Sequence, residues 1–201
     1  MSVIKHKEQR VAVLIDVQNM YHSAKHLHKA RVNFDGVVKA AVADRKLVRA
    51  IAYVVRSDVE EEKSFFEALT RQGIETKIKD LQVFYGGAKK ADWDVGITVD
   101  AVRLAPSIDV IALVSGDGDF VPVVEYLKNQ GKQVEAMAFG DSASARLKET
   151  VDDFTDLSSD PGRFLMKSRR VELEMQQRIR GGRERPEPKP RAPGRTIRFH
   201  H

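Results

Sequence analysis

The sequence predicts an α/β fold: a three-layer sandwich in which a mainly parallel sheet is covered by helices on both faces. Apolar runs of strand length, such as VAVLID at 11–16 and DVIALVSG at 109–116, are typical of strands buried on both sides. Amphipathic stretches of helix length separate these runs, as βαβ units require. A length of 201 residues fits one domain and a tail.

The elements follow one another along the chain in this alternating pattern. Apolar or alternating runs predict strands at 11–16, 47–55, 74–80, 109–116 and 133–140. Amphipathic stretches predict helices at 20–30, 35–45, 59–71, 93–105, 120–131 and 143–149. Gly73 and Gly131 are expected to end two helices, and Pro106 follows a third. Residues 81–92 are expected to form a loop with at most a short extended piece.

The C-terminal part divides from the body by its composition. We expect a body at 1–160, a helix at 161–180 and a basic tail at 181–201. An apolar stripe on the helix packs either on the body or on a second subunit, so a homodimer through this helix is one expectation. The tail is rich in Pro, Gly and Arg, a composition typical of disordered segments.

Charge is distributed unevenly along the chain. Residues 162–201 hold 12 Lys or Arg and 4 Asp or Glu, a net charge of +8, whereas the preceding residues carry −3. A basic tail on an acidic body favours phosphate-rich partners such as nucleic acid, or an anionic membrane surface. A tail that only increases solubility is the simpler alternative.

The composition also excludes several classes of protein. The chain has no cysteine, which rules out disulfide scaffolds, thiol nucleophiles and iron–sulfur clusters. No apolar run approaches the 18 or so residues that span a bilayer, and the start lacks the apolar stretch of a signal peptide. We therefore expect a cytoplasmic protein that does not enter a membrane.

Four aspartates occupy positions where such a fold carries its chemistry. Asp16 ends the first strand, Asp117 and Asp119 follow a later strand within SGDGDF (115–120), and Asp94 lies where a loop becomes a helix. Because parallel strands end at one edge of the sheet, where ligands of open α/β sheets bind, Asp16 and Asp117 should share that edge. The glycines of SGDGDF should allow a tight turn there.

Clustered carboxylates of this kind indicate a metal site. They repel one another and ionise best around a cation. Ligation by oxygen without His or Cys suits Mg²⁺ or Mn²⁺, and one or two such ions assist phosphoryl displacement. Each aspartate also has a simpler interpretation: Asp16 and Asp119 as helix caps, and Asp94 as a first-turn residue favoured by the helix dipole.

Other phosphate- and metal-binding patterns fit less well. The first strand is followed by DVQNMY, which lacks the glycines of a dinucleotide-binding turn, and a P-loop is absent. Haloacid-dehalogenase phosphatases have a second Asp where this chain has Gln18. His22 and His26 have helical spacing but no third ligand, which favours a solvated helix face. Asp100 lies six residues after Asp94, on a different face of its helix.

Three motifs together resemble a known family. VAVLIDVQNMY, KKADWDVGITVDAVRLA and DVIALVSGDGDFVPVVEYLKNQGKQVEAMAFG occur in that order, and the resemblance covers about residues 10–157. The chain is similar to the NYN domain of the PIN-like nuclease superfamily, in its LabA-like branch. The family pattern matches Asp16, Asn19, Asp94, Asp117 and Asp119. The resemblance implies a parallel sheet, a divalent metal and cleavage of RNA, leaving 5′-phosphate and 3′-hydroxyl ends.

The resemblance also implies roles for the matched residues. Asp16, Asp94 and Asp117 would hold the metal directly or through water, and Asp119 would complete the acidic ring. Asn19 would orient Asp16 or a phosphate.

Further residues are candidates for contact with single-stranded RNA. Ser115 is expected to bond the scissile phosphate or a water at the metal. Lys89 and Lys90 are expected to contact the RNA backbone as point charges. Trp93, where many relatives have a smaller residue, is a candidate stacking platform along with Tyr85, whereas Phe120 is favoured as a core residue.

Two other functions stay open at this point. A non-catalytic RNA-binding or regulatory module is one, because fold does not fix function. A metal-dependent phosphatase or nucleotidase is the other. The complete acidic set argues against the first, and the basic tail, which suits a polymer, argues against the second.

Overall fold

Strand β1 (Arg10–Asp16) forms in the middle of the sheet because its side chains are apolar on both faces. After its first residue the whole strand is buried, as expected for a parallel strand covered on both sides. Successive side chains alternate, so Val13 and Ile15 join the apolar cluster on one face. Ala12 and Leu14 join the cluster on the other face.

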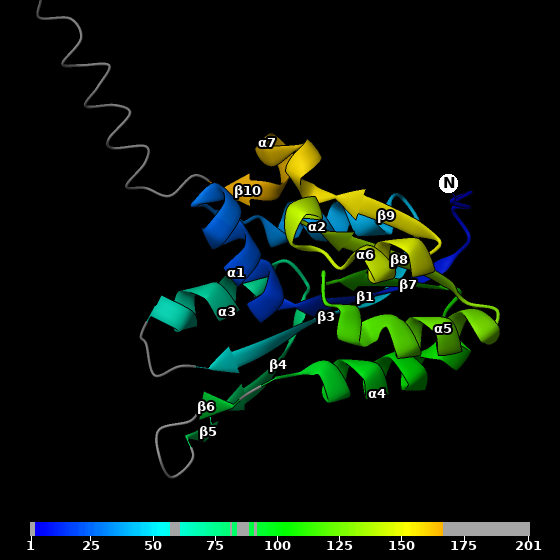
Figure 1. The fold of residues 1–201 in the computed structure, drawn as a ribbon, viewed down its shortest axis with the longest axis horizontal. Helices are drawn as coiled ribbons and strands as arrows, with labels where there is room; N and C mark the ends of the chain where they lie inside the picture. Colours follow the sequence, from blue (N-terminus) through cyan, green and yellow to red (C-terminus); the bar gives the residue numbers. More distant parts are fainter. Residues whose placement is uncertain (1–2, 57–60, 81, 84–88, 91, 167–201) are drawn as a thin grey trace, which may run out of the picture. The chain divides into compact units, whose positions relative to one another are not determined.

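The computed structural model describes residues 3–56, 61–80, 82–83, 89–90 and 92–166. Within these residues the main sheet has six parallel strands in the order β4-β3-β1-β7-β8-β9 (Figure 1). The strands that join β1 are β3 (Lys46–Arg56), β4 (Glu75–Asp80), β7 (Val110–Val114), β8 (Gln133–Ala138) and β9 (Asp153–Asp156). The predicted α/β class with a parallel sheet is confirmed.

Helices cover both faces of this sheet and complete the three layers (Figure 1). One face carries α1 (Val17–His28), α2 (Phe34–Val42), α3 (Glu61–Arg71) and α7 (Pro161–Phe164). The other carries α4 (Asp94–Leu104), α5 (Val121–Asn129) and α6 (Ala145–Thr150). Short 3₁₀ helices connect them: η1 (Ala105–Ser107), η2 (Gly118–Phe120), η3 (Gly140–Ser142) and η4 (Leu157–Ser159). Among the described helices, none has the length and apolar character needed to cross a membrane.

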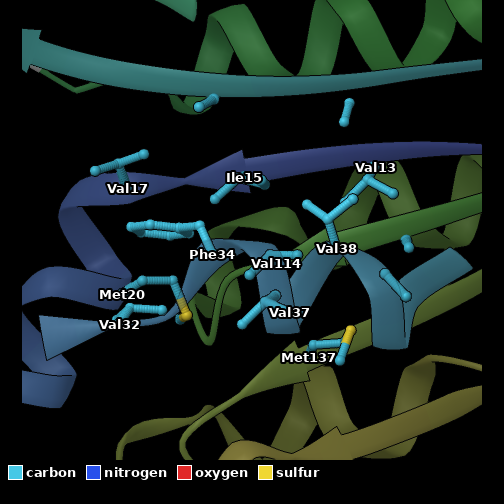
Figure 2. Close-up of a cluster of buried hydrophobic side chains, with 14 of the residues drawn as sticks. Val13, Ile15, Val17, Met20, Val32, Phe34, Val37, Val38, Val114 and Met137 are labelled. Carbon is cyan, nitrogen blue, oxygen red and sulfur yellow. The ribbon is translucent and has the colours of Figure 1, made fainter. Parts of the chain in front are cut away.

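The core consists of two apolar clusters, one on each face of the sheet. Figure 2 shows the cluster between α2 and the sheet, where Phe34, Val37 and Val38 lie with Val13 of β1 and Val114 of β7. Burying a side chain of this size contributes about 1.5–3 kcal/mol relative to leaving it exposed. The two clusters therefore fix the central strands, and with them the positions of the residues at the strand ends.

Two helices end where the sequence predicts, at glycines with left-handed backbones. Gly73 follows α3 and Gly131 follows α5, each with a φ of +73°. A side chain is strained in this conformation and glycine is not, so these residues stop the helix and turn the chain toward the next strand.

The edge strand β9 is the main element that the sequence prediction misses. The prediction takes 133–140 as the last strand of the body, but β9 pairs parallel with β8 beyond it. Its sequence, DFTD, is polar and only partly buried, because an edge strand has one neighbour. It therefore lacks the apolar pattern that identifies the central strands.

The segment after residue 160 also differs from the expected helix at its start. The helix α7 ends at Phe164, and Leu165–Met166 forms β10, which pairs antiparallel with β2 (Arg31–Val32). The rest of the predicted helix, the homodimer contact expected from it and the basic tail lie outside the described residues. In the predicted loop, β5 (Gln82–Val83) pairs antiparallel with β6 (Lys89–Lys90).

The order of the strands reverses next to β1. From β1 the chain adds β3 and β4 on one side, and it then crosses back through α4 to place β7, β8 and β9 on the other. The carboxyl ends of β1 and β7 therefore flank a topological switch point, which is where open α/β sheets bind ligands.

Candidate metal centre

The predicted site residues gather at this switch point. Asp16 is the last residue of β1, and residues 115–119 follow β7 directly. Asp94 is the first residue of α4, which leads back into β7, so its N-terminus lies at the same edge of the sheet. Elements far apart in the sequence thus bring their polar ends together.

Three carboxylates converge closely. Asp94, Asp117 and Asp119 each offer one oxygen, and these oxygens lie within 4.8 Å of one another. Asp94 and Asp117 are half-buried, and Asp119 is exposed. Asp16, with 8% of its surface exposed, lies outside this group of three. The structure therefore joins three of the four predicted ligands directly, and the fourth is connected to them by hydrogen bonds.

A chain of hydrogen bonds links Asp119 to Asp16. The backbone N–H of Asp119 donates to Asp117 Oδ1 (3.0 Å), and the backbone N–H of Asp117 donates to Ser115 Oγ (3.2 Å). The Ser115 hydroxyl in turn donates to Asp16 Oδ2 (3.2 Å). Since Ser115 is fully buried, this chain holds the acidic segment in one conformation against the end of β1.

Asn19 ties the first turn of α1 to the same segment. Its backbone N–H donates to Asp16 Oδ1 (3.0 Å), and its side-chain Oδ1 accepts from the backbone N–H of Gly116 (3.0 Å). Both oxygens of Asp16 are therefore used within the protein. The backbone of Asn19 therefore helps to orient Asp16, and its side chain holds Gly116. The role in catalysis that the resemblance implies for Asn19 stays a prediction.

The glycines of SGDGDF are needed for space at this site. A Cβ at Gly116 would lie 3.0 Å from Ala143 Cα, and one at Gly118 would lie 2.8 Å from Ser144 Oγ. Neither glycine has a positive φ. Their missing side chains let the loop before α6 pack closely against the acidic segment, a role that the predicted tight turn did not include.

Burial and like charges shift the pKa values of two of these aspartates upward. Burial raises the pKa of Asp16, and the negative charge of Asp117 raises it further. The hydrogen bonds from Asn19 and Ser115 lower this pKa, but they do not cancel the effect of burial. Burial and the charges of Asp117 and Asp16 raise the pKa of Asp94 to about 6. In the metal-free protein, ionised carboxylates at this site therefore repel one another.

This donor set fits a hard divalent cation. Three carboxylate oxygens within 4.8 Å, with no His or Cys among them, are suited to Mg²⁺ or Mn²⁺. A cation among them would also remove the repulsion that raises the pKa of Asp94. The residues of this cluster that would hold such a cation are Asp94, Asp117 and Asp119.

Comparison with known proteins identifies the family. The model of the NYN domain matches residues 10–159, most of the chain. This chain belongs to the NYN domain family. The match spans β1 to η4, and thus contains every element that contributes to the acidic cluster.

Individual relatives of this NYN domain come from distant organisms. The low amplitude and bright protein LabA of Synechococcus elongatus is 27% identical over 176 residues, which cover 83% of this chain and 92% of LabA. The uncharacterized protein MJ0482 of Methanocaldococcus jannaschii is 30% identical over 72% of this chain, which spans about half of MJ0482 (54%). A crystal structure of VPA0982, a protein of unknown function from Vibrio parahaemolyticus, superposes with a TM-score of 0.73 at 31% identity. The superposition covers 82% of this chain and 100% of the VPA0982 chain.

Helix capping and metal ligation coexist in this NYN domain. Asp16 caps α1 through Asn19 N–H, and Asp117 caps η2 through Asp119 N–H. Asp119 itself is not an N-cap, contrary to one sequence interpretation, because η2 begins at Gly118, two residues before the expected helix, and is capped by Asp117. Asp94 begins α4, as its simpler interpretation requires.

Trp93 anchors the residue next to it. Its indole N–H donates to the carbonyl of Val54 in β3 (2.9 Å), and its ring meets the Tyr53 ring edge-on at a centroid distance of 5.4 Å. A Cβ at Gly96 would lie 2.5 Å from Trp93 Cε3, so this glycine makes room for the indole. The half-buried ring thus fixes the start of α4, and with it Asp94. Apart from the presence of a tryptophan, no feature of the sequence predicts this role.

One residue expected to contact the scissile phosphate or a water at the metal lies inside the protein. Ser115 is fully buried, and its hydroxyl donates to Asp16, so in this structure it positions the acidic segment. Phe120 is also fully buried and packs in the core, as favoured from the sequence. Lys89 and Lys90 form β6, but their side chains, like Tyr85, lie outside the described residues.

A second polar group lies beside the site and was not predicted. Asp100 accepts hydrogen bonds from Tyr53 Oη (2.7 Å) and Lys77 Nζ (2.5 Å). Burial disfavours its charge, but these hydrogen bonds outweigh burial and lower the pKa of Asp100. Asp100 is therefore engaged by β3 and β4, which agrees with its predicted exclusion from the metal ligands.

Proposed function

We propose that this NYN domain is a divalent-metal-dependent ribonuclease that hydrolyses phosphodiester bonds of single-stranded RNA. The observation that carries the proposal is the convergence of Asp94, Asp117 and Asp119 within 4.8 Å at the switch point of the sheet. Without a cation such a cluster would repel a polyanion. With one it is suited to phosphoryl transfer, and the resemblance to PIN-like nucleases supports that reaction class.

The metal would be Mg²⁺ or Mn²⁺. Asp94, Asp117 and Asp119 would hold it, each through an oxygen of the cluster. When bound, an ion of this kind activates water and stabilises the oxygens of an in-line phosphoryl displacement. The resemblance implies products with 5′-phosphate and 3′-hydroxyl ends.

The surrounding residues hold the ligands in place. Asp16 receives Asn19 N–H on one oxygen and the Ser115 hydroxyl on the other, so it restrains both α1 and the acidic segment. Trp93 restrains Asp94 through β3. Fixed ligands lower the reorganisation needed when a charged substrate arrives, which is how a rigid site contributes to catalysis.

The proposal includes the RNA contacts expected from the sequence. Lys89 and Lys90, in β6, precede α4 by a few residues and would act on phosphates as point charges. The basic residues at 181–201 would bind the same polymer without base preference.

The deciding experiment is incubation of the full chain with end-labelled single-stranded RNA in Mn²⁺, Mg²⁺ or EDTA. We expect cleavage with metal, none in EDTA, and none with Asp117→Asn, which removes the charge without changing the volume. Asp35→Asn, on α2 and paired with Lys39, is the matched control and should cleave normally. Full activity in EDTA or in Asp117→Asn would contradict the proposal.

The same assay, repeated with mononucleotides and accompanied by a measurement of RNA binding, separates the two competing functions. RNA binding without cleavage under every metal condition would indicate a non-catalytic RNA-binding or regulatory module. Hydrolysis of mononucleotides but not of RNA would indicate a phosphatase or nucleotidase.

The basic segment is tested separately. We expect a chain ending at Arg180 to bind RNA with a weaker salt dependence, because each lost phosphate contact lowers the log–log slope by roughly 0.7 for single strands. The KM for long RNA should rise, and kcat for a dinucleotide-scale substrate should not change. Equal salt slopes for the two chains would show that residues 181–201 do not bind RNA.

A further inference from the structure

The segment that follows Asp16 has a charge opposite to that of the rest of the body. Residues 17–34 contain no Asp or Glu, but they contain Lys25, Lys29 and Arg31, a net charge of +3. The body as a whole, residues 1–161, carries −3. This basic segment includes all of α1, which begins at the metal centre.

The helix dipole does not account for this composition. Cations near the C-terminus of α1 are favoured by the dipole, but acidic residues are equally favoured in its first turn, and none is there. Asp35 and Asp94 lie in the first turns of α2 and α4. The first turns of α5 and α6 also lack acid, but each of these helices carries a glutamate further along, whereas α1 has none along its whole length. The absence of acid along α1 therefore calls for another explanation.

The polar residues of α1 form one continuous exposed face, here called the α1 face. Its members recur at helical spacing and are exposed, whereas the opposite side packs against the sheet through Met20 and Ala24. The residues of the α1 face are Gln18, Tyr21, His22, Lys25, His26 and Lys29.

The cations of the α1 face are free to bind an external anion. Lys25 Nζ lies 3.3 Å from the hydroxyl of Tyr21, and Lys29 Nζ donates to the carbonyl of His26 (3.1 Å). Neither forms an ion pair with a described carboxylate, whereas Lys39 and Lys46, elsewhere on the surface, both do. A lysine without a carboxylate partner can bind a phosphate without first breaking an ion pair.

The position of α1 connects this face to the metal centre. The helix starts at the residue after Asp16 and rises about 1.5 Å per residue, so Lys25 and Lys29 lie about 13 and 20 Å along its axis. Tyr21, which is 46% exposed, lies between them and the centre, with Lys25 Nζ 5.4 Å from its ring. An exposed aromatic ring beside cations suits a strand with unpaired bases.

We propose that the α1 face binds the phosphate backbone of the RNA strand on its way to the metal centre. The proposal takes its substrate from the proposed function, but it concerns binding, which can be measured without cleavage. Lys25 and Lys29 would contact phosphates, and Tyr21 would offer a surface for a base.

The test is the affinity of the full chain for a fluorescein-labelled 20-nucleotide single-stranded RNA in EDTA, measured by anisotropy over a salt series. The test variant is Lys25→Gln with Lys29→Gln. The control is Lys39→Gln with Lys46→Gln, which changes the net charge equally at exposed sites of α2 and of the start of β3. Loss of two phosphate contacts should lower the slope of log affinity against log salt concentration by roughly 1.4. At 0.1 M salt, relative to a 1 M reference, this corresponds to about 25-fold weaker binding of the α1 variant.

The outcomes distinguish this proposal from the proposed function. A loss confined to the α1 variant supports the RNA-binding face whether or not the protein cleaves RNA. Equal affinity of wild type and α1 variant, or equal losses in both variants, would overturn it, even if metal-dependent cleavage is found. Weaker binding of the α1 variant to phosphatidylserine vesicles, with RNA affinity unchanged, would also overturn it and indicate a membrane surface as the partner.

Discussion

Metal affinity should fall steeply as the pH drops through the pKa of Asp94. This carboxyl has a pKa of about 6, raised by burial and by the charges of Asp117 and Asp16. A carboxylate binds a cation only when it is deprotonated, so protons compete with the metal at this residue. The centre should therefore bind Mn²⁺ well at pH 7 and poorly at pH 5.

The magnitude follows from the same value. With a pKa of about 6, Asp94 is ionised in about 90% of molecules at pH 7 and in about 10% at pH 5. The apparent dissociation constant for Mn²⁺ should therefore be about tenfold higher at pH 5, with little change between pH 7 and 8. The metal-free fold responds in the opposite direction. Because the folded pKa lies above the ordinary 3.8, the fold gains stability from Asp94 as the pH falls from 7 toward 4 and loses it as the pH rises through 6.

The assay is calorimetric titration of the full chain with Mn²⁺ at pH 5, 6, 7 and 8. Asp94→Asn should bind more weakly at pH 7 and should lose most of the pH dependence between 5 and 7. Asp35→Asn, on α2 at the opposite face of the sheet from α4, should retain the wild-type profile. An affinity that is constant from pH 5 to 8, or an undiminished pH dependence in Asp94→Asn, would refute the assignment of Asp94 as a ligand.

Three further changes test the framework around the centre. Asp117→Asn should have an equal or higher melting temperature than wild type in EDTA, because Asn keeps the cap of η2 and removes a repelling charge. A clearly lower melting temperature would show that the charge itself stabilises the turn. Ser115→Ala should lower the free energy of unfolding in urea by about 1–3 kcal/mol, since Asp16 Oδ2 and the backbone N–H of Asp117 lose their shared partner. An unchanged urea midpoint would contradict the hydrogen-bond chain. Glu135→Gln should lower the free energy of unfolding in urea by about 3–5 kcal/mol, because it breaks a buried ion pair with Arg45 (2.6 Å). Metal binding should not change, since this pair lies away from the centre, and a loss of metal affinity would contradict that separation.

The central strands and the edge that carries the site could be predicted from the sequence because burial leaves a pattern. Strands such as β1 and β7 are covered on both faces, so nearly every residue is apolar, and each run ends at a polar residue where the chain emerges. A parallel sheet brings those ends together, so the sequence alone predicts that Asp16 and Asp117 share one edge.

The details of the centre could not be predicted because they depend on contacts between distant residues. The edge strand β9 is polar, and its pairing depends on β8 rather than on its own sequence. Trp93 is a plausible stacking residue in the sequence, and only the distance from its indole nitrogen to the Val54 carbonyl shows that it anchors α4. The glycines at 116 and 118 look like turn residues until the side chains of the neighbouring loop are in place.

Capping and metal binding looked like alternative interpretations of the aspartates, and the structure shows why they are compatible. A carboxylate has two oxygens, and a cap uses one. Asp117 receives Asp119 N–H on Oδ1, which leaves its other oxygen available to the cluster with Asp94. Asp16 accepts a hydrogen bond on each oxygen and lies outside the cluster of three, so it supports the acidic segment, and its expected role as a fourth ligand stays a prediction. An Asn substitution keeps the cap and removes the charge at Asp117, so it separates the two roles at that position. At Asp94, which accepts no capping hydrogen bond from a described residue, the same substitution should affect the metal alone.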